Sequence, residues 1–269
     1  MGAIAHQPEP GQWSGGLQPA DRQAKACRST PEARHCRRDY ILNMLRSPRF
    51  HDRLEAGRLL GAELARTLRD GTSLIVLGLP RGGVPVAAEV AKALDAPLDV
   101  FIVRKLGVPG HEELAMGAIA SGGVRVINQE VLNYVPQARS AIESVAAREE
   151  QELQRRERAY RGSRAPLDVH DKMVIVVDDG LATGSTMRAA VEALRKMQPR
   201  AIIVAVPVAA KQTCDEFRRD GINVICLRTP EPFEAVGLWY DDFSQTSDEE
   251  VHEILDERNP QDAHSTHRS

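Results

Sequence analysis

The sequence lacks the long apolar segments that membrane insertion requires. No run approaches the roughly 18 consecutive apolar residues of a membrane-spanning helix. The first residues, MGAIAHQPEPGQWSGG, have neither the charged region nor the apolar region of a signal peptide. We therefore expect a cytoplasmic protein with no membrane partner.

Cysteine, aromatic residues and net charge are also scarce. The four cysteines, at positions 27, 36, 214 and 226, include no CxxC pair, so we interpret them as reduced thiols. A zinc site at Cys27, His35 and Cys36 stays an alternative, although a fourth ligand and tight spacing are missing. Aromatic residues make up 4% of the chain and hydrophobic residues 42%, which predicts an aliphatic core. A formal net charge of −3 gives no reason to expect nucleic-acid binding, so any phosphate site must be local.

What the 269 residues do contain is an alternation of strand and helix patterns. Short β-branched runs predict five strands, at residues 73–79, 99–103, 172–179, 201–208 and 223–227. Helical periodicity predicts helices at residues 52–69, 84–94, 137–161, 185–197 and 211–219. This alternation predicts an α/β fold with a doubly wound, mainly parallel five-stranded sheet and flanking helices.

The segments between these patterns define the expected domain organisation. Residues 104–123 are rich in glycine and are expected to form a loop, and GVRVIN at 123–128 is expected to pair with AMGAIA in a small hairpin. The mixed charges of residues 137–161 are typical of a solvated helix face. We expect a disordered extension at residues 1–43, a folded α/β domain at 44–258 with a helical insert at 128–166, and a disordered tail at 259–269. Met44 is an alternative start of the chain.

The stretch VVDDGLATGST at residues 176–186 carries the most specific chemistry. It joins a strand to a helix, and a helix N-terminus offers unpaired N–H groups and the positive end of a dipole. Gly184 permits close approach of the backbone, and the hydroxyls of Ser185 and its neighbours add donors, so the turn suits one phosphate.

Two acids, Asp178 and Asp179, precede this turn. They would repel a phosphate in direct contact, but each suits a hydrogen bond from one hydroxyl of a sugar diol. Neither the GxGxxG dinucleotide fingerprint nor the GxxxxGK[ST] P-loop occurs in the chain. The pattern therefore predicts a ribose 5-phosphate site. A capped turn with solvent-facing acids is the structural alternative.

The motif VIVVDDGLATGSTM resembles the signature of the type I phosphoribosyltransferases, which bind 5-phosphoribosyl 1-pyrophosphate. The resemblance covers about residues 50–256 in architecture, and only this motif and two further turns in residue detail. The insert at 128–166 resembles a branch of uncharacterised bacterial phosphoribosyltransferases more than the purine salvage enzymes. The resemblance implies that Asp178 and Asp179 bind the ribose hydroxyls and meet Mg²⁺ only indirectly. It implies that the 5-phosphate is held by Ala182, Thr183, Gly184, Ser185 and Thr186.

The turn after the first strand consists of Leu79, Pro80, Arg81, Gly82 and Gly83. Two glycines let backbone N–H groups point into one concavity, and Arg81 supplies a planar donor for phosphate oxygens. In the family the loop at this place binds pyrophosphate, often through a strained or cis peptide. A turn needed only for tight packing of strand and helix is the alternative.

A basic pair, Arg104 and Lys105, follows the second strand. The family carries a basic residue here that contacts pyrophosphate, which Lys105 matches best and Arg104 second. A mobile loop follows in the family and closes over the site, which excludes water. His111, Glu112 and Glu113 fall in this segment and are expected to be solvated loop residues.

The resemblance implies a transferase that moves phosphoribosyl from 5-phosphoribosyl 1-pyrophosphate to a nitrogenous base, with Mg²⁺ as cofactor. The catalytic residues it implies are Asp178, Asp179, Lys105 and Arg81. A symmetric homodimer is the expected assembly. The alternatives are a nucleotide-sensing regulator that keeps the fold without turnover, and a different reaction on the same cradle, such as pyrophosphorolysis or hydrolysis.

The acceptor is left open by the sequence. Family enzymes that use 6-oxopurines generally carry an acid where Ala182 stands, so hypoxanthine and guanine are not favoured. A small hood is expected from the N-terminal part of the domain or from residues 230–243. Phe233, Trp239 and Tyr240 in that segment either stack on a base or pack in the core.

Overall fold

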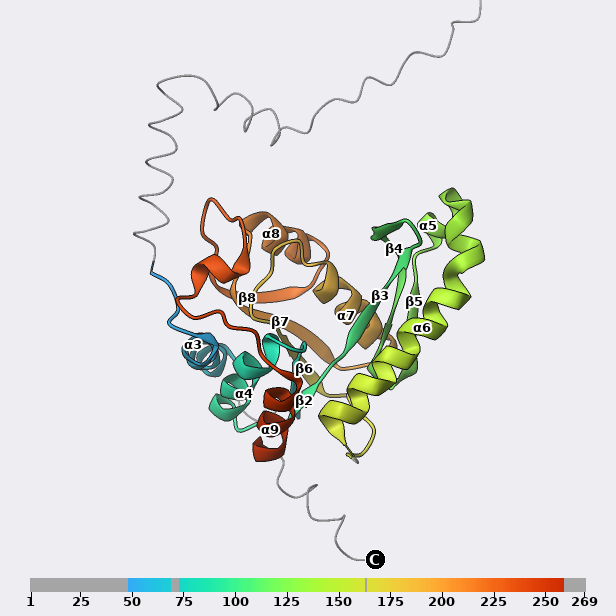
Figure 1. Cartoon of the computed structure of the whole chain (residues 1–269). Coiled ribbons are helices and arrows are strands. Elements are labelled where there is room, and N and C mark those ends of the chain that lie inside the picture. Colours follow the sequence, from blue (N-terminus) through green and yellow to red (C-terminus); the bar gives the residue numbers. More distant parts are fainter. Residues whose placement is uncertain (1–47, 69–72, 163, 259–269) are drawn as a thin grey trace, which may run out of the picture. The chain divides into compact units, whose positions relative to one another are not determined.

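A five-stranded parallel sheet forms the centre of the fold in the computed structural model, which describes residues 48–68, 73–162 and 164–258. The strands run in the order β2-β1-β6-β7-β8, and every neighbouring pair is parallel (Figure 1). Their bounds are β1 Leu74–Gly78, β2 Leu98–Val100, β6 Met173–Val177, β7 Ala201–Val208 and β8 Asn223–Arg228. The expected α/β fold with a parallel five-stranded sheet is therefore confirmed.

Both faces of this sheet are buried by helices, as continuous β-branched strands require. Val76 and Val177 belong to a core that includes residues of α3 (Arg53–Thr67) and α4 (Gly83–Ala93). Their strand neighbours Leu77 and Val176 belong to a second core with α7 (Ser185–Lys196) and α8 (Lys211–Arg219). The expected helices are all present, and the carboxyl ends of β1 and β6 lie side by side in the middle of the sheet.

The expectation of a loop at 104–123 is wrong. β3 (Val103–Val108) and β4 (His111–Ala120) form an antiparallel hairpin, and β5 (Val124–Ile127) completes a separate three-stranded sheet. Two glycines in this segment suggested a loop, but in the structure they let the backbones of neighbouring strands approach closely. A Cβ at Gly107 would lie 2.7 Å from the Glu112 carbonyl oxygen, and one at Gly117 would overlap the Val126 carbonyl oxygen. The expected pairing of 123–128 with AMGAIA is confirmed.

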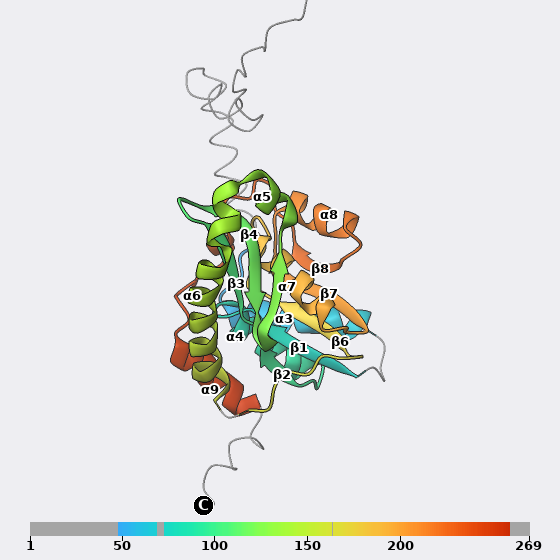
Figure 2. The same ribbon diagram turned by 90° about the vertical axis from the view of Figure 1, so that its right-hand side faces the viewer.

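The insert forms two helices, α5 (Gln129–Tyr134) and α6 (Pro136–Arg161), and α6 runs along the three-stranded sheet (Figure 2). Asn128 caps α5 by accepting a hydrogen bond from Val131 N at 3.2 Å. α6 buries one stripe, which includes Val145, Leu153 and Tyr160, against the first core. The remainder of α6 is charged and largely exposed, in agreement with the expected solvated face.

The C-terminal part holds the short helix η2 (Val236–Trp239) and α9 (Asp248–Arg258), a helix that the sequence patterns did not reveal. α9 packs against α4 and α6 through Val251 and Leu255. Trp239 and Tyr240 are only 2% and 3% exposed and pack with Phe50, so they belong to the core and are not available to stack on a base.

Several expectations fall outside the described residues, namely the extension at 1–43, Met44, the tail at 259–269, and the cysteines at 27 and 36. All the helices and strands named above belong to one compact unit that begins at Arg49. No helix within the described ranges is long and apolar enough to cross a membrane. The described residues also contain no group of three or more His, Cys, Asp or Glu that is arranged to hold a metal.

Candidate functional site

Pairing of β1 with β6 brings the two expected turns into direct contact. Gly78 and Val177 are register partners at the carboxyl ends of these strands, so the turn at 79–83 lies against Asp178 and Asp179. A Cβ at Gly83 would lie 2.7 Å from the Val177 carbonyl oxygen and 2.9 Å from Asp178 Cα. A Cβ at Gly82 would overlap Asp179 Oδ2. Glycine at both positions is therefore required by the approach of the two turns.

Each acid of the pair has one oxygen occupied by the protein. Asp178 Oδ1 accepts a hydrogen bond from Asp179 N at 2.9 Å. Asp179 Oδ2 accepts from Arg53 Nε at 3.0 Å and lies 2.9 Å from Arg53 Nη2. Within the described part of the chain, no other residue makes a hydrogen bond to Asp178 Oδ2 or Asp179 Oδ1. The pair thus offers two free acceptor oxygens, one from each residue.

The surroundings of the two acids disfavour their charged forms. Burial raises the pKa of Asp178 well above its ordinary value, and the neighbouring Asp179 charge raises it further. Burial also raises the pKa of Asp179, while the Arg53 guanidinium acts in the opposite direction. A ligand that donated hydrogen bonds to the free oxygens, or brought a cation, would offset this cost. Carboxylates with pKa values raised by burial occur often at ligand-binding and catalytic sites.

The turn after Asp179 ends in an open helix N-terminus. Gly184, the N-cap of α7, has φ 70° and ψ 8°, makes no side-chain capping bond, and no acid follows in the first turn of the helix. Its Cβ would lie 2.6 Å from Phe217 Cε2, so packing as well as backbone conformation demands glycine. Thr183, Ser185 and Thr186 are exposed beside these free N–H groups. The arrangement suits an anion.

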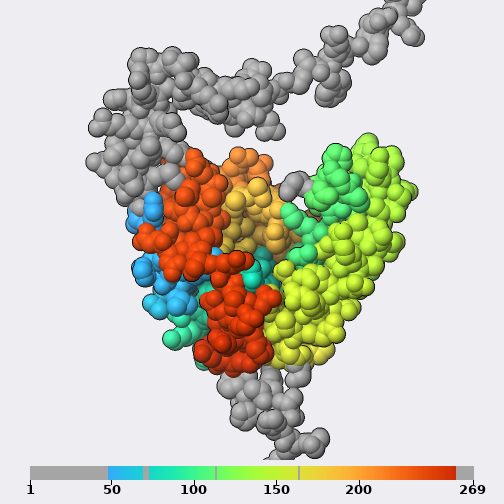
Figure 3. Space-filling view, in the orientation of Figure 1, coloured from blue at the N-terminus to red at the C-terminus, as the bar shows by residue number. Residues whose placement is uncertain are grey.

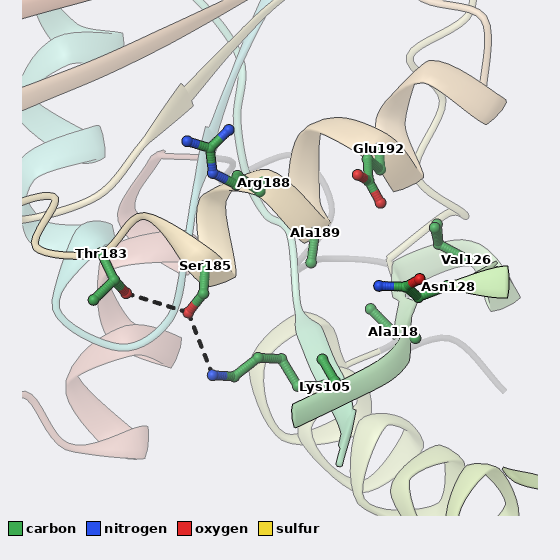
Figure 4. A pocket seen from close by; sticks show the side chains of 11 residues that line it. Lys105, Ala118, Val126, Asn128, Thr183, Ser185, Arg188, Ala189 and Glu192 are labelled. Carbon is green, nitrogen blue, oxygen red and sulfur yellow. Dashed lines mark hydrogen bonds between the residues drawn. The ribbon is translucent and has the colours of Figure 1, made fainter. Parts of the chain in front are cut away.

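Lys105 reaches this helix N-terminus from β3. Its Nζ donates a hydrogen bond to Ser185 Oγ at 3.3 Å (Figure 4), and among the described residues it makes no ion pair. Lys105, Thr183 and Ser185 line one end of a groove of about 440 Å³ between α7 and the three-stranded sheet. The space-filling view shows a hollow between the green β3–β4 hairpin and the gold to orange helices (Figure 3). A cation without an ion-pair partner beside an open helix N-terminus is an arrangement that favours a bound anion.

Arg81 lies in the turn beside the acid pair, whereas Arg104 does not join the site. The peptide bond between Pro80 and Arg81 is cis, as the resemblance implied for this turn. The α4 N-terminus that follows has no side-chain cap and no acid in its first turn. Arg104 donates to Glu149 Oε2 of α6 through Nε at 2.9 Å and Nη2 at 2.6 Å. Because neighbours alternate along a strand, Arg104 and Lys105 project to opposite faces of β3.

Comparison with known proteins assigns the chain to a family. The model of the phosphoribosyl transferase domain matches residues 51–238. The chain belongs to the phosphoribosyltransferase family. The members of this family are enzymes of the pentosyltransferase type.

Individual relatives support the assignment. Two curated proteins of Mycobacterium tuberculosis strains, named "Putative phosphoribosyl transferase" MT0597 and Rv0571c, are each 45% identical over 207 residues, which is 77% of this chain and 46% of the relative. The chain thus spans about half the length of the curated relatives it matches. A crystal structure, that of TT1426 from Thermus thermophilus, has 43% identity and a TM-score of 0.70, and it covers 78% of this chain and 99% of the other.

Two residues of this candidate site were not predicted from the sequence. Arg53 contacts Asp179 across 126 positions of sequence. Asp248 of α9 lies 3.6 Å from Arg81 Nη1 and accepts a hydrogen bond from Tyr160 Oη at 2.7 Å. Neither belongs to a local motif, so no spacing rule could have found them. His111 and Glu112, expected as solvated loop residues, are exposed at the start of β4.

Proposed function

We propose that this chain transfers a phosphoribosyl group from 5-phosphoribosyl 1-pyrophosphate to a nitrogenous base and releases pyrophosphate. The observation that carries the proposal is the pairing of two free carboxylate oxygens with an open helix N-terminus a few residues later. Ribose 5-phosphate has a vicinal diol and a terminal phosphate, which match these two features in kind and in order. Family membership supplies the reaction type.

The ribose and its phosphate define the first half of the proposed site. One hydroxyl donates to Asp178 Oδ2 and the other to Asp179 Oδ1, the two oxygens that no described residue occupies. The 5-phosphate accepts hydrogen bonds from the N–H groups and hydroxyls of residues 182–186, with the Lys105 ammonium beside Ser185. These contacts fix the sugar with its anomeric carbon away from the α7 N-terminus.

The pyrophosphate end of the donor lies at residues 79–83. The open N-terminus of α4 supplies N–H groups, and Arg81 supplies a guanidinium that is one-third exposed and held only by Asp248 at 3.6 Å among the described residues. As the bond from the anomeric carbon to pyrophosphate breaks, its electron pair leaves with the pyrophosphate. These fixed donors stabilise the charge that develops there. A nitrogen of the acceptor forms the new bond to the anomeric carbon and loses its proton.

The cofactor proposed for this reaction is Mg²⁺. Mg²⁺ commonly keeps several waters and takes only one or two carboxylates together with substrate oxygens. The two buried carboxylates, in a region without a three-ligand cluster among the described residues, fit that mode. Asp178 and Asp179 would hold the ion indirectly, through water or the ribose hydroxyls. When bound, Mg²⁺ would neutralise charge on the pyrophosphate.

The acceptor, location and assembly belong to the same proposal. Ala182 offers no carboxylate to handle a base proton, so the acceptor we favour is a base other than hypoxanthine or guanine. We further propose a cytoplasmic location and a symmetric homodimer. Size-exclusion chromatography with light scattering measures the assembly, and a monomeric mass at micromolar concentration would contradict the homodimer.

A substrate panel tests the proposed function. The protein is incubated with 5-phosphoribosyl 1-pyrophosphate, Mg²⁺ and a series of nitrogenous bases, and pyrophosphate release is measured. We expect release with at least one base and none in the D178N/D179N double variant. Tight binding of the donor without release for any base would instead support the nucleotide-sensing alternative.

A further inference from the structure

Arg53 occupies a position that links three separate parts of the molecule. It begins α3 directly after the N-cap Asp52, and its side chain is only 11% exposed. Its Nε and Nη2 contact Asp179 Oδ2, as described above, and its Nη1 donates to the Ser244 carbonyl oxygen at 2.6 Å. Its guanidinium carbon lies 4.0 Å from the centre of the Phe243 ring. A single side chain therefore joins α3, the acid pair and residues 243–244.

Asp179 is also tied to the C-terminal segment through its main chain. Tyr240 Oη donates to the Asp179 carbonyl oxygen at 2.6 Å. The Tyr240 ring packs 5.1 Å from Phe243 and 5.5 Å from Phe50, measured between ring centres. Residues 240–244 thus hold Asp179 at two points, directly at its carbonyl and through Arg53 at its carboxylate.

We propose that Arg53 is a positioning residue that decides which oxygen of Asp179 receives the ribose hydroxyl and couples the donor site to residues 240–244. The inference rests on the proposed function. Because Arg53 occupies Oδ2, Asp179 presents Oδ1 to the sugar. Gly82 leaves room for Oδ2 on the same side, since a Cβ there would overlap Oδ2 and approach Arg53 Nε within 3.1 Å.

The contact also requires arginine and not merely a positive charge. The guanidinium donates from Nε to Asp179 Oδ2 and places Nη2 beside the same oxygen. It donates from Nη1 to the Ser244 carbonyl oxygen, and its flat face lies on the Phe243 ring. A lysine ammonium is a point charge on a flexible stem and cannot make all three contacts at once. Lysine at position 53 would keep the charge beside Asp179 but release residues 243–244.

Three variants test the inference: R53A, R53K and, as a matched control, R58A. Arg58 lies on the same helix and pairs with Glu89 at 3.2 Å, but its side chain is 64% exposed and makes no ion pair with either acid. Thermal unfolding confirms that each variant is folded. Isothermal calorimetry at neutral pH then measures the affinity of each variant for 5-phosphoribosyl 1-pyrophosphate with Mg²⁺.

We expect R53A to bind the donor roughly tenfold more weakly or worse at neutral pH. R53K should recover only part of that affinity, because it cannot make all three contacts, and R58A should match wild type. Wild-type affinity in folded R53A, or full rescue by R53K, would overturn the positioning role while leaving the proposed function intact. Absence of donor binding in the wild-type protein itself would overturn the proposed function, and this role with it.

Discussion

The contact between the two turns can be tested by adding one methyl group at Gly83. In G83A the new Cβ would lie 2.7 Å from the Val177 carbonyl oxygen, about 0.7 Å short of the 3.4 Å at which ordinary contact begins. It would also lie 2.9 Å from Asp178 Cα. Both neighbours are backbone atoms in or next to the central sheet, so the turn at 79–83 must move instead. Overpacking of this kind costs about 1–3 kcal/mol.

This displacement has consequences for stability and for binding. In a domain of this size, the melting temperature falls by roughly 2–4 °C for each kcal/mol lost. Moving the turn by several tenths of an ångström also separates Arg81 and the α4 N-terminus from the acid pair. We therefore expect G83A to bind 5-phosphoribosyl 1-pyrophosphate at least about tenfold more weakly, since misplacement by about 1 Å can cost roughly a hundredfold in a site that works by orientation.

A control variant separates these two effects. Ala88 lies on α4, partly buried against the first core and away from the acids, and A88G weakens the helix by about 1 kcal/mol through glycine's cost in helices. Calorimetric titration with the donor and thermal unfolding are measured for both variants. A88G should lose stability but keep donor affinity. If G83A melted lower and yet bound the donor as wild type does, the close approach of the turns would have no role in binding.

Three further substitutions test individual side chains. Burial raises the pKa of Asp178 above its unfolded value of about 3.8, so the folded state loses stability as the pH rises past that value. D178N should therefore melt at a higher temperature than wild type near neutral pH, and this gain should vanish toward about pH 3. A gain in melting temperature that does not depend on pH would contradict this cause. K105A should leave the melting temperature unchanged, because the Lys105 ammonium makes only one hydrogen bond among the described residues, to the Ser185 hydroxyl. The variant should bind ribose 5-phosphate about 10-fold to 100-fold more weakly. Unchanged affinity in calorimetry would show that Lys105 does not bind the phosphate. R104A leaves the buried Glu149 without one of its partners, so the free energy of unfolding in denaturant should fall by roughly 1–3 kcal/mol. The affinity for the donor should stay at the wild-type value. Loss of affinity without loss of stability would mean that Arg104 does bind the substrate.

Local patterns in the sequence were sufficient for the central sheet. The ranges expected for the strand at 201–208 and the helix at 211–219 match β7 and α8 residue for residue. The turn at 178–186 follows β6 and opens α7 as expected. These segments are predictable because the spacing of their apolar residues, their turn residues and their burial all indicate the same element within a short stretch of sequence.

The three-stranded sheet was missed for a physical reason. Gly107 and Gly117 suggested a loop, but they allow backbone atoms of neighbouring strands to approach closely. β3 also shifts register at Leu106 and Gly107, which breaks the alternation that marks a strand. α9 was missed because only two of its residues are buried, too few for a clear helical stripe.

The site was predictable only where chemistry is local. The acid pair and the turn at 79–83 come together as the resemblance implied. Lys105 differs, because the resemblance implied contact with pyrophosphate but its ammonium lies beside Ser185 at the phosphate turn. The binding roles of all these residues stay predictions. Arg53 and Asp248 lie far along the chain from the groups they contact, and a single sequence contains no signal for such pairs. Arg104 was predicted at the site but does not lie there. Adjacent residues of a strand point to opposite faces, so only Lys105 of the basic pair faces α7.

The most direct test of the account is a crystal structure of the protein with ribose 5-phosphate. We expect the phosphate at the N-terminus of α7 and the two ring hydroxyls on Asp178 Oδ2 and Asp179 Oδ1, with Arg53 still on Oδ2. A sugar seated elsewhere, or one whose hydroxyls point away from both acids, would contradict it.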